Sequence, residues 1–271
     1  MARVTVYVIG DTHGCLTALD TLLQAEGLTD RDHRWTGGTD ELWFLGDYTD
    51  RGPDGVGVIE RVMDLQAQAQ TAGGRVGALL GNHDVILLNA QDLPEETVPD
   101  LTIAGQPWTF RQLWQDHAGG QASDAAHLTP EHLTWLRARP LLARVGDTLL
   151  MHADTTMYLD LGDTPDEINA AGHALLHSRD ATLRGTFEAN FARRQEFMPD
   201  VLPDDEAEAN LQAMLGASGC TRLVHGHTPV FLLHGQPAAN VTEPYVYAQG
   251  RCTDVDAALF AGGPGFTLRL P

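Results

Sequence analysis

The sequence has few of the features that mark a disulfide-stabilised or membrane-spanning protein. Its three cysteines, Cys15, Cys220 and Cys252, are widely spaced and odd in number, so they predict neither a disulfide framework nor a CxxC zinc site. The longest apolar runs span only a handful of residues, too few for a transmembrane helix. The N-terminal residues lack the charged, apolar and small-residue regions of a signal peptide. Together these absences predict a cytoplasmic protein with reduced thiols.

Basic residues are also scarce. Only 17 Lys and Arg stand against 37 Asp and Glu, which gives a formal net charge of -20. Nucleic acids and anionic membranes are bound by basic patches, so we expect neither as a partner. The same charge would repel an anionic small molecule unless bound cations reverse the sign locally. If the chain acts on an anion, its composition is therefore compatible with a site that holds divalent metal ions.

The sequence does contain five apolar runs that each end in polar, metal-capable residues. Apolar runs of this length, bounded by glycine, indicate buried strands that end in loops. Because ligands of open α/β sheets bind at the carboxyl ends of strands, we expect the five ends to converge on one site. The runs and the residues that follow them are Val4 to Ile9 with Asp11 and His13, Leu42 to Leu45 with Asp47, Asp50 and Arg51, Val76 to Leu80 with Asn82 and His83, Leu149 to Met151 with His152, and Leu223-Val224 with His225 and His227.

The segments between these runs predict an α/β fold. Leucines at helical spacing indicate a helix over residues 15 to 26, and a second helix covers about 58 to 65 and ends by Gly73. The β-α-β-α-β order favours parallel strands with crossover helices. We expect one domain over residues 1–271, with helical insertions at about 89–140 and 164–216. The part from Leu223 onward is read as short strands joined by Gly and Pro turns.

The polar residues at the strand ends form a chemically coherent ligand set. A mixture of Asp, His and Asn suits first-row divalent metals without selecting one. Asp11 and His13 can turn toward one ion, and the two oxygens of Asp47 can bridge two ions. Asn82, His152 and His227 would coordinate the second ion. Two ions about 3.5–4 Å apart would clamp an in-line displacement and activate a bridging hydroxide as the nucleophile, so no Ser or Cys nucleophile is needed.

Three further residues have different predicted roles. His83 adjoins Asn82, and as a protonated imidazole beside the leaving group it would be a general acid. Asp50 would accept its other N–H and hold the ring oriented and cationic. Arg51 offers a fork of donors that matches phosphate oxygens.

These motifs carry a family resemblance over about residues 4 to 260. They resemble the ordered motif set of the phosphoprotein phosphatase (PPP-type) branch of calcineurin-like metallophosphoesterases, and within it most closely the Shewanella-like phosphatases. The resemblance implies a four-layer α/β/β/α sandwich, and at matching positions it implies the ligand and catalytic roles given above. The motifs are GDTHG at 10–14, GDYTDRG at 46–52, GNHD at 81–84, MHAD at 151–154 and HGHTP at 225–229.

The resemblance also implies an activity and cofactors. It implies a phosphomonoesterase acting on a phosphoprotein, with Ser/Thr or Tyr specificity open, or on a small phosphomonoester. The alternatives are a symmetrical dinucleoside-tetraphosphatase, which shares three of the motifs, and a metal-bound binding module without turnover. Two divalent or trivalent metal ions are expected, manganese first, with iron or zinc as alternatives. The oligomeric state is not predicted.

The chain departs from the family pattern at several positions. GNHD has Asp84 where eukaryotic protein phosphatases usually carry Glu, and MHAD puts Ala153 and Asp154 where small glycines are common. A second phosphate-binding arginine is expected between His152 and His227. We expect Arg179 to have this role, with Arg184, Arg193 and Arg194 as alternatives. His225 is interpreted as a packed or supporting histidine, and Asp256 as either a family acid or a turn acid.

Overall fold

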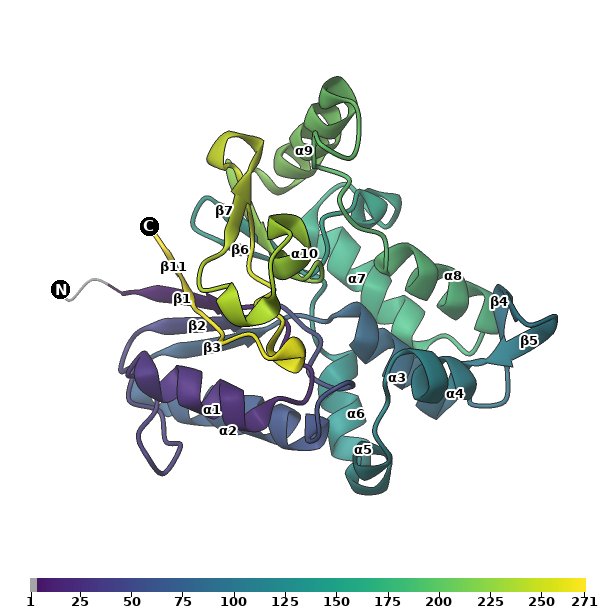
Figure 1. Cartoon of the computed structure of the whole chain (residues 1–271), viewed down its shortest axis with the longest axis horizontal. Coiled ribbons are helices and arrows are strands. Elements are labelled where there is room, and N and C mark those ends of the chain that lie inside the picture. The colour runs from purple at the N-terminus through teal and green to yellow at the C-terminus, as the bar shows by residue number, and fades with distance from the viewer. Residues whose placement is uncertain (1–3) are drawn as a thin grey trace.

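The computed structural model describes residues 4–271 and contains two main sheets. The first sheet has the order β11-β1-β2-β3 (Figure 1). Strands β1 (Val6–Ile9), β2 (Glu41–Phe44) and β3 (Arg75–Ala78) are parallel, and β11 (Leu268–Leu270) joins β1 in the antiparallel direction. The predicted parallel β-α-β-α-β unit is therefore present, and its three strands end at the same edge of the sheet.

The second sheet is built from the C-terminal half of the chain, in the order β6-β7-β8-β10-β9. Its central strands β7 (Thr148–Met151), β8 (Arg222–His225) and β10 (Cys252–Asp254) are parallel to one another. The edge strands β6 (Leu142–Val145) and β9 (Tyr245–Tyr247) run antiparallel to their neighbours. Both sheets thus present a set of parallel strands with a shared carboxyl edge.

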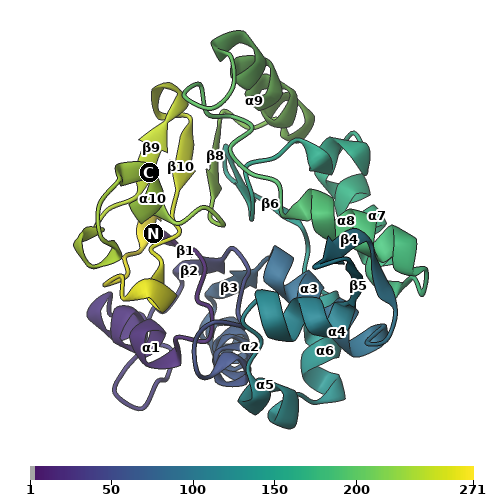
Figure 2. The same cartoon turned by 45° about the vertical axis from the view of Figure 1, so that its right-hand side comes forward.

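Alternating side chains divide the core into layers. Val8 of β1 and Leu79, which follows β3, pack in one buried cluster with Leu150 and Val224 of the second sheet. The neighbouring residue Leu149 points to the opposite face and belongs to a different cluster, as the period of two in a strand requires. Helices lie outside the sheets, with α1 and α2 below the first sheet in Figure 2. The predicted four-layer α/β/β/α sandwich is confirmed.

The first two helices follow their sequence signals closely. Helix α1 spans Leu16–Ala25 and α2 spans Gly55–Ala72. The Asp54 side chain caps α2 by accepting the N–H of Gly57 at 2.9 Å. Gly73 ends α2 with φ +82°, a left-handed conformation that glycine adopts without steric cost. No helix in the part of the chain that the structure describes is both long and apolar enough to cross a membrane.

The expectation of a loop after the third strand is wrong. Helix α3 begins at Asn82 and runs to Asp92, so Asn82 and His83 lie in its first turn. The helix starts there because the Asp84 carboxylate accepts the N–H of Gly81 at 2.8 Å and caps the N-terminus. The apolar run from Val85 to Leu88 is thus the buried middle of a helix.

The first insertion is only partly helical. It contains a hairpin of β4 (Thr97–Ile103) and β5 (Gln106–Thr109) where the sequence predicted helical structure, and each strand includes a proline. Proline is tolerated in such two-stranded ribbons because neither strand is central. The helical elements that follow are α4 (Phe110–Gln112), a π-helical turn at Leu113–His117, α5 (Ala122–His127) and the predicted α6 (Pro130–Arg137).

The second insertion is helical, as expected. It contains α7 (Pro165–His177), α8 (Ala181–Phe191) and α9 (Asp204–Ser218). Near the C-terminus lies the short helix α10 (Val230–His234). Single 3-10 turns occupy Met157–Asp160, Ala238–Asn240, Ala248–Gly250 and Leu259–Ala261. The C-terminal region after β8 therefore combines the expected short strands with helical turns.

Candidate active site

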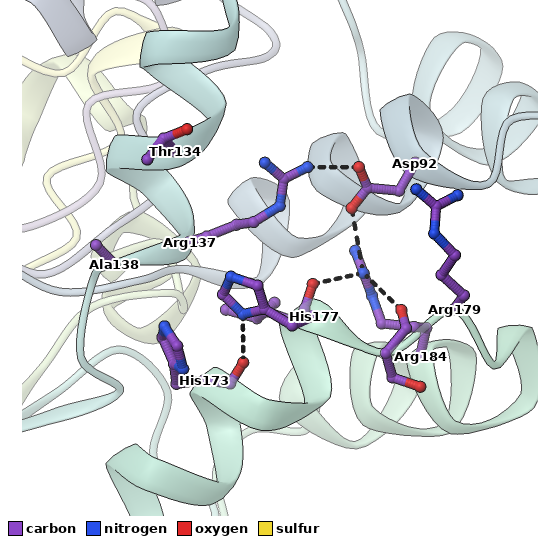
Figure 3. Close-up of a pocket in the computed structure, with 10 residues that line it drawn as sticks. Asp92, Thr134, Arg137, Ala138, His173, His177, Arg179 and Arg184 are labelled. Atoms are coloured by element: carbon purple, nitrogen blue, oxygen red, sulfur yellow. Dashed lines mark hydrogen bonds and ion pairs between the residues drawn. The ribbon is translucent and has the colours of Figure 1, made fainter.

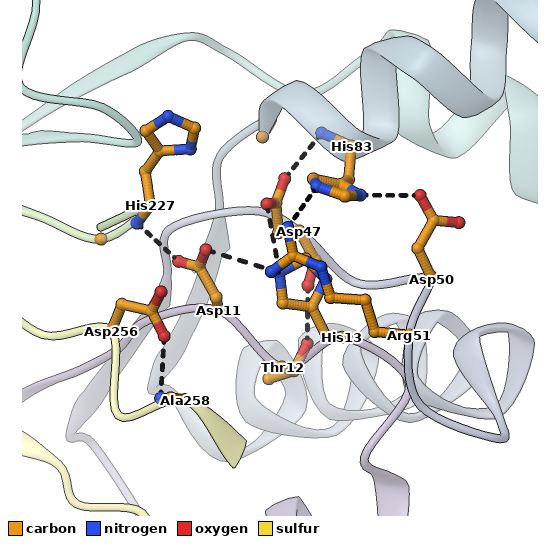
Figure 4. Close-up of polar contacts among 12 residues, drawn as sticks. Asp11, Thr12, His13, Asp47, Asp50, Arg51, His83, His227, Asp256 and Ala258 are labelled. Atoms are coloured by element: carbon orange, nitrogen blue, oxygen red, sulfur yellow. Dashed lines mark hydrogen bonds and ion pairs between the residues drawn. The ribbon is translucent and has the colours of Figure 1, made fainter. Parts of the chain in front are cut away.

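The predicted ligands meet at the carboxyl edges of the two sheets, and Figure 4 shows Asp11, His13, Asp47 and His227 among them. Each follows the end of its strand directly, so the parallel strands carry their polar side chains to one place. All of these side chains are buried, which is unusual for so many polar groups unless they are paired or bind metal. The residues are Asp11 and His13 after β1, Asp47 after β2, Asn82 after β3, His152 after β7 and His227 after β8.

Asp47 lies between two groups of potential ligands. Its Oδ2 is 3.5 Å from Nε2 of His13, and its Oδ1 is 3.5 Å from Nε2 of His152. One group that could hold an ion consists of His13, Asp47 and His83, and the other of Asp47, His152 and His227. A carboxylate shared by two such groups is the geometry that a pair of neighbouring cations requires.

The imidazoles are held in the form that binds metal. Nδ1 of His13 donates to the Thr49 carbonyl at 3.0 Å, and Nδ1 of His152 donates to the Leu45 carbonyl at 2.9 Å. His227 is reversed, since its Nε2 donates to the Ala192 carbonyl at 3.1 Å. A carbonyl oxygen can only accept, so in the neutral form of each ring the other nitrogen carries no proton. Metal-ligating histidines are oriented by the same kind of bond.

Two further contacts fit a bound cation. Asn82 Oδ1 lies 2.9 Å from Nε2 of His152, so two acceptor atoms face each other without a proton between them. Asp11 Oδ1 accepts the N–H of His227 at 3.0 Å, but its buried Oδ2 has no hydrogen-bond partner within residues 4–271. That oxygen lies 3.8 Å from Nε2 of His13. Cations would satisfy these atoms, and the donor set therefore fits two metal ions.

Burial sets the charge of this cluster. Burial, and next the charge of Asp47, raise the pKa of Asp11 well above its ordinary value. Burial disfavours the charged form of the histidines too, so it lowers the pKa of His13 and His227 and lowers that of His152 to about 3. The histidines are therefore neutral at physiological pH, which is the ligating form, and bound cations would restore the ionised carboxylates.

The backbone at the site is strained in a consistent way. Five residues of the motifs have a positive φ although none is glycine, namely His13 (42°), Asp47 (54°), Asp50 (71°), Arg51 (62°) and His227 (70°). Such left-handed conformations cost free energy for side chains with a Cβ and concentrate at functional sites. The motif glycines allow close approach: a Cβ at Gly81 would lie 2.1 Å from Asp47 Oδ1, and one at Gly226 would lie 2.3 Å from Asp11 Oδ1.

His83 is oriented by a carboxylate rather than by a carbonyl. Its Nδ1 lies 2.8 Å from Oδ2 of Asp50. The other oxygen of Asp50 accepts the indole N–H of Trp114 at 2.7 Å. Trp114 comes from the first insertion, and no sequence signal links a tryptophan to a carboxylate 64 positions away. The insertion thus helps to hold the His83–Asp50 pair.

The expected cationic state of His83 is not what this environment favours. Burial, and next the charge of Arg51, lower the pKa of His83. Burial raises the pKa of Asp50 to about 7, although the bonds from Trp114 and Thr49 act in the opposite direction. Desolvation outweighs the attraction of a single carboxylate, which the spacing of motifs in a sequence does not reveal. An anionic group beside Nε2 would favour the protonated ring.

Arg51 lies across the face of the site. Its Nη1 donates to Nε2 of His13 and its Nη2 to Nε2 of His83, both at 2.9 Å. The guanidinium also lies 4.5 Å from the ring centroid of Phe260. Its side chain is exposed, unlike the ligands beneath it. The fork of donors therefore lies where an incoming phosphate could meet it.

Arg179 is not brought to this site. It is exposed just after α7 and lines a cavity with Asp92 and Arg137, on another part of the insertion. Arg194, one of its rivals, instead lines a cavity of about 250 Å³ together with Arg51 and His83. The difference follows from the path of the chain, because α8 runs back toward the site after α7 has led away from it. We therefore replace Arg179 by Arg194 as the candidate phosphate-binding arginine.

The cavity beside His83 is walled by both insertions. The first contributes Leu113, His117 and Ala118, and the second contributes Glu188, Ala189 and Ala192 along with Arg194. Burial raises the pKa of Glu188 to about 7, so this wall carries less negative charge than its sequence indicates. The groups that would surround a substrate thus come mainly from the segments least like the family pattern.

Two further buried acids, Asp154 and Asp256, accept hydrogen bonds from the backbone. Asp154 is buried and accepts the N–H of Gln195 at 2.8 Å and the hydroxyl of Tyr247 at 3.0 Å, which ties down the segment that carries Arg194. Tyr247 also lies 2.9 Å from Nε2 of the buried His225, which belongs to neither ligand group. Asp256 accepts the N–H of Ala258 at 2.8 Å, and its Oδ2 has no hydrogen-bond partner among residues 4–271.

Asp84 is the third such acid and connects two motifs. Its carboxylate accepts the N–H groups of Gly81, Asp47 and Tyr48 at 2.8, 3.0 and 3.1 Å, fully buried. Replacing Asp84 by alanine is expected to destabilise the fold by about 3 kcal/mol or more, because three buried donors lose their acceptor. The measurement is the free energy of unfolding of the wild type and the variants, obtained from urea unfolding at a fixed metal concentration. Asp84→Asn retains an oxygen and should lose clearly less, whereas an alanine variant as stable as the wild type would contradict this role.

Comparison with known proteins agrees with the geometry. Residues 4–231 match the family model described as calcineurin-like phosphoesterase. The chain belongs to the calcineurin-like phosphoesterase family. The resemblance inferred from the five motifs is thereby confirmed at the level of the family.

Several similar sequences are named symmetrical bis(5'-nucleosyl)-tetraphosphatase. A symmetrical bis(5'-nucleosyl)-tetraphosphatase of Legionella pneumophila is 28% identical over 204 residues, which cover 73% of this chain and 59% of the relative. A Vibrio cholerae protein of the same name is 33% identical over 156 residues, covering 57% of this chain and 46% of the relative. The chain thus spans about three fifths or less of the length of these relatives.

Solved structures of other phosphatases share the fold at lower identity. A cold-active protein-tyrosine phosphatase from a Shewanella species has a TM-score of 0.70 at 21% identity, over 99% of this chain and 76% of that one. A Saccharomyces cerevisiae protein serine/threonine phosphatase has a TM-score of 0.59 at 15% identity, over 98% and 72%. At these identities the likeness establishes the calcineurin-like fold and says nothing of the substrate.

Proposed function

We propose that this phosphoesterase hydrolyses its substrate at a two-metal centre held by Asp11, His13, Asp47, Asn82, His152 and His227. The observation that carries the proposal is the carboxylate of Asp47, whose two oxygens face two separate histidine groups. The buried, unpartnered Oδ2 of Asp11 and the neutral histidines support it. Manganese is the first expectation, with iron or zinc as alternatives. When bound, such ions polarise the phosphoryl group and activate water.

The remaining residues act on the substrate itself. Arg51 and Arg194 bind phosphate oxygens, since both are exposed cations lining the cavity beside His83. His83 donates a proton from Nε2 to the leaving oxygen, while Asp50 accepts its Nδ1–H and fixes the ring. The anionic phosphate next to Nε2 raises the proton affinity of the ring and offsets the effect of burial. Trp114 in turn holds Asp50 in place.

For the substrate, we infer a phosphorylated small molecule, with a dinucleoside tetraphosphate as the first candidate. Sequence relatives at 28–33% identity carry the tetraphosphatase name, and their matched regions cover more than half of this chain. This inference reverses the order given by the motifs alone, which put a phosphoprotein first. The cleaved bond would then be a phosphoanhydride, and the symmetrical reaction would yield two nucleoside diphosphates.

A substrate panel separates these alternatives. Metal-loaded protein would be assayed on diadenosine tetraphosphate, on phosphoserine and phosphotyrosine peptides and on an aryl phosphate, with product analysis. We expect kcat/KM on the dinucleotide to exceed that on the peptides at least about tenfold, a difference of about 1.4 kcal/mol in transition-state binding. Peptides hydrolysed faster than the dinucleotide would restore the phosphoprotein assignment. Absence of hydrolysis of every compound with several divalent metals would support a binding module instead.

Arginine 194 offers a sharp test of the substrate cavity. Replacing Arg194 by alanine is expected to raise KM about tenfold with a smaller change in kcat, because one charge-assisted contact to the phosphate is lost in ground state and transition state alike. The matched control is Arg193→Ala, which removes the same charge from the neighbouring position, where the side chain instead pairs with Glu196. Equal increases in KM for the two variants would mean that the substrate responds to the overall positive charge of the segment and not to a direct contact with Arg194.

A further inference from the structure

A second cationic cavity lies near the N-terminal end of helix α8, whereas the cavity beside His83 lies near its C-terminal end. It has a volume of about 410 Å³ and is lined by residues of α6, α7 and the start of α8. Figure 3 shows Arg137, Arg179 and Arg184 around it, with His173 and His177 on the adjoining turn of α7. The imidazole rings of these two histidines lie 4.3 Å apart. The proposed catalytic reaction uses none of these residues.

Arg184 is the anchored member of this cavity. Its side chain is only 1% exposed, and its Nη1 donates to the Leu176 carbonyl at 2.7 Å and to Asp92 Oδ2 at 3.2 Å. Its Nε donates to Asn89 Oδ1 at 2.6 Å. Its Nη2 has no hydrogen-bond partner among residues 4–271. A buried guanidinium with an unpaired N–H group destabilises the fold, because that group has lost its hydration. An acceptor atom of a bound ligand would offset this cost.

The charge of the cavity contrasts with that of the chain. The chain carries a formal net charge of -20, and all of its 17 basic residues are arginines. Three of those arginines line this one cavity, where Asp92 is the single acid. Asp92 pairs with both Arg137 and Arg184, whereas Arg179 is exposed and makes no ion pair within residues 4–271. The cavity therefore holds two positive charges in excess, and Arg179 is available to a ligand.

We propose that this cavity binds a phosphate-bearing small molecule, independently of the active site. Planar guanidinium groups match the oxygens of phosphate with paired hydrogen bonds, and Arg179 and Arg137 supply such groups from two sides. Inorganic phosphate would fill only part of a cavity of this volume. The exposed Ala138 adds an apolar group to the lining, so a phosphate ester such as a nucleotide fits the cavity better than the free ion.

The test follows the NMR resonances of the His173 and His177 rings, because these rings line this cavity and not the active site. Protein labelled with 13C-histidine and loaded with zinc would be titrated with inorganic phosphate and with AMP at fixed pH, with sodium chloride at matched ionic strength. The two signals are assigned through His173→Gln and His177→Gln. Saturable shifts are expected with both phosphate compounds and not with chloride. Tighter binding of AMP than of phosphate is expected if the apolar surface is used.

Substitutions then connect the shifts to the arginines. Arg179→Ala is expected to weaken binding about tenfold, the effect of losing one charge-assisted contact, and Arg179→Glu to abolish it. The matched control is Arg31→Ala, an exposed arginine elsewhere in the chain, which should leave the affinity unchanged. The proposal is overturned if the histidine signals follow ionic strength alone, or if the Arg179 variants bind as tightly as the wild type. A failure here leaves the two-metal site unaffected, since no residue is shared.

Discussion

Replacing His83 by asparagine is expected to lower the hydrolysis of a substrate with a poor leaving group about a thousandfold. The poor leaving group needs a proton as its bond to phosphorus breaks, and general acid catalysis contributes on the order of 10²–10⁴ to such reactions. His83 is placed for this role because Asp50 holds its Nδ1 at 2.8 Å while Nε2 faces the cavity that contains Arg51. Asparagine keeps an N–H for Asp50 but supplies no acidic proton to the substrate.

The decisive comparison is with an activated aryl phosphate. Its leaving group departs without a proton, so the same variant should lose at most about tenfold on that substrate. The matched control is His127→Asn, an exposed histidine on α5 that lies outside both ligand groups. Steady-state kcat/KM on both substrates is the measurement. Equal losses on the good and the poor leaving group would show that His83 orients or binds the substrate and is not the acid.

Replacing Asp47 by asparagine is expected to remove both metal ions and to lower kcat/KM about a thousandfold, or about 4 kcal/mol. The carboxylate is shared between the two groups, so a single substitution takes a negative ligand from both at once. Substitution of His152 or His227 should affect the second group first. Metal analysis of the purified variants, together with activity at increasing metal concentration, distinguishes these patterns.

The control for Asp47 is another buried carboxylate. Asp124 is 1% exposed and accepts the N–H groups of Gly55 and Val56 with one oxygen, which asparagine can also do. Asp124→Asn should therefore retain both metals and full activity. An Asp47→Asn variant that keeps two ions per chain and near-normal turnover would contradict the bridging role. Loss of one ion only would mean that the carboxylate serves a single metal.

The strand ends were predictable because each short apolar run stops abruptly at a metal-capable residue. The parallel strands of the first sheet bring Asp11 and Asp47 together, and the carboxyl edge of the second sheet adds His227. The start of α3 at Asn82 was not predictable in the same way. Its cap depends on Asp84, whose carboxylate also bonds the backbone of a different motif. A tertiary contact of this kind has no local signature.

The insertions show most clearly where sequence reasoning stops. The choice of Arg179 over Arg194 depended on the direction of α8, and helical spacing gives length but not direction. The bond from Trp114 to Asp50 joins an insertion to a motif, and neither residue predicts the other. The same insertions wall the cavity beside His83, so the choice of substrate depends on the least predictable part of the chain.

The most direct test of the two-metal site is anomalous X-ray diffraction from crystals of the protein loaded with manganese or zinc. We expect two anomalous peaks, one on each side of the Asp47 carboxylate. One peak should lie next to His13 and Asp11, and the other next to His152, His227 and Asn82. A single peak, or peaks remote from Asp47, would contradict the account.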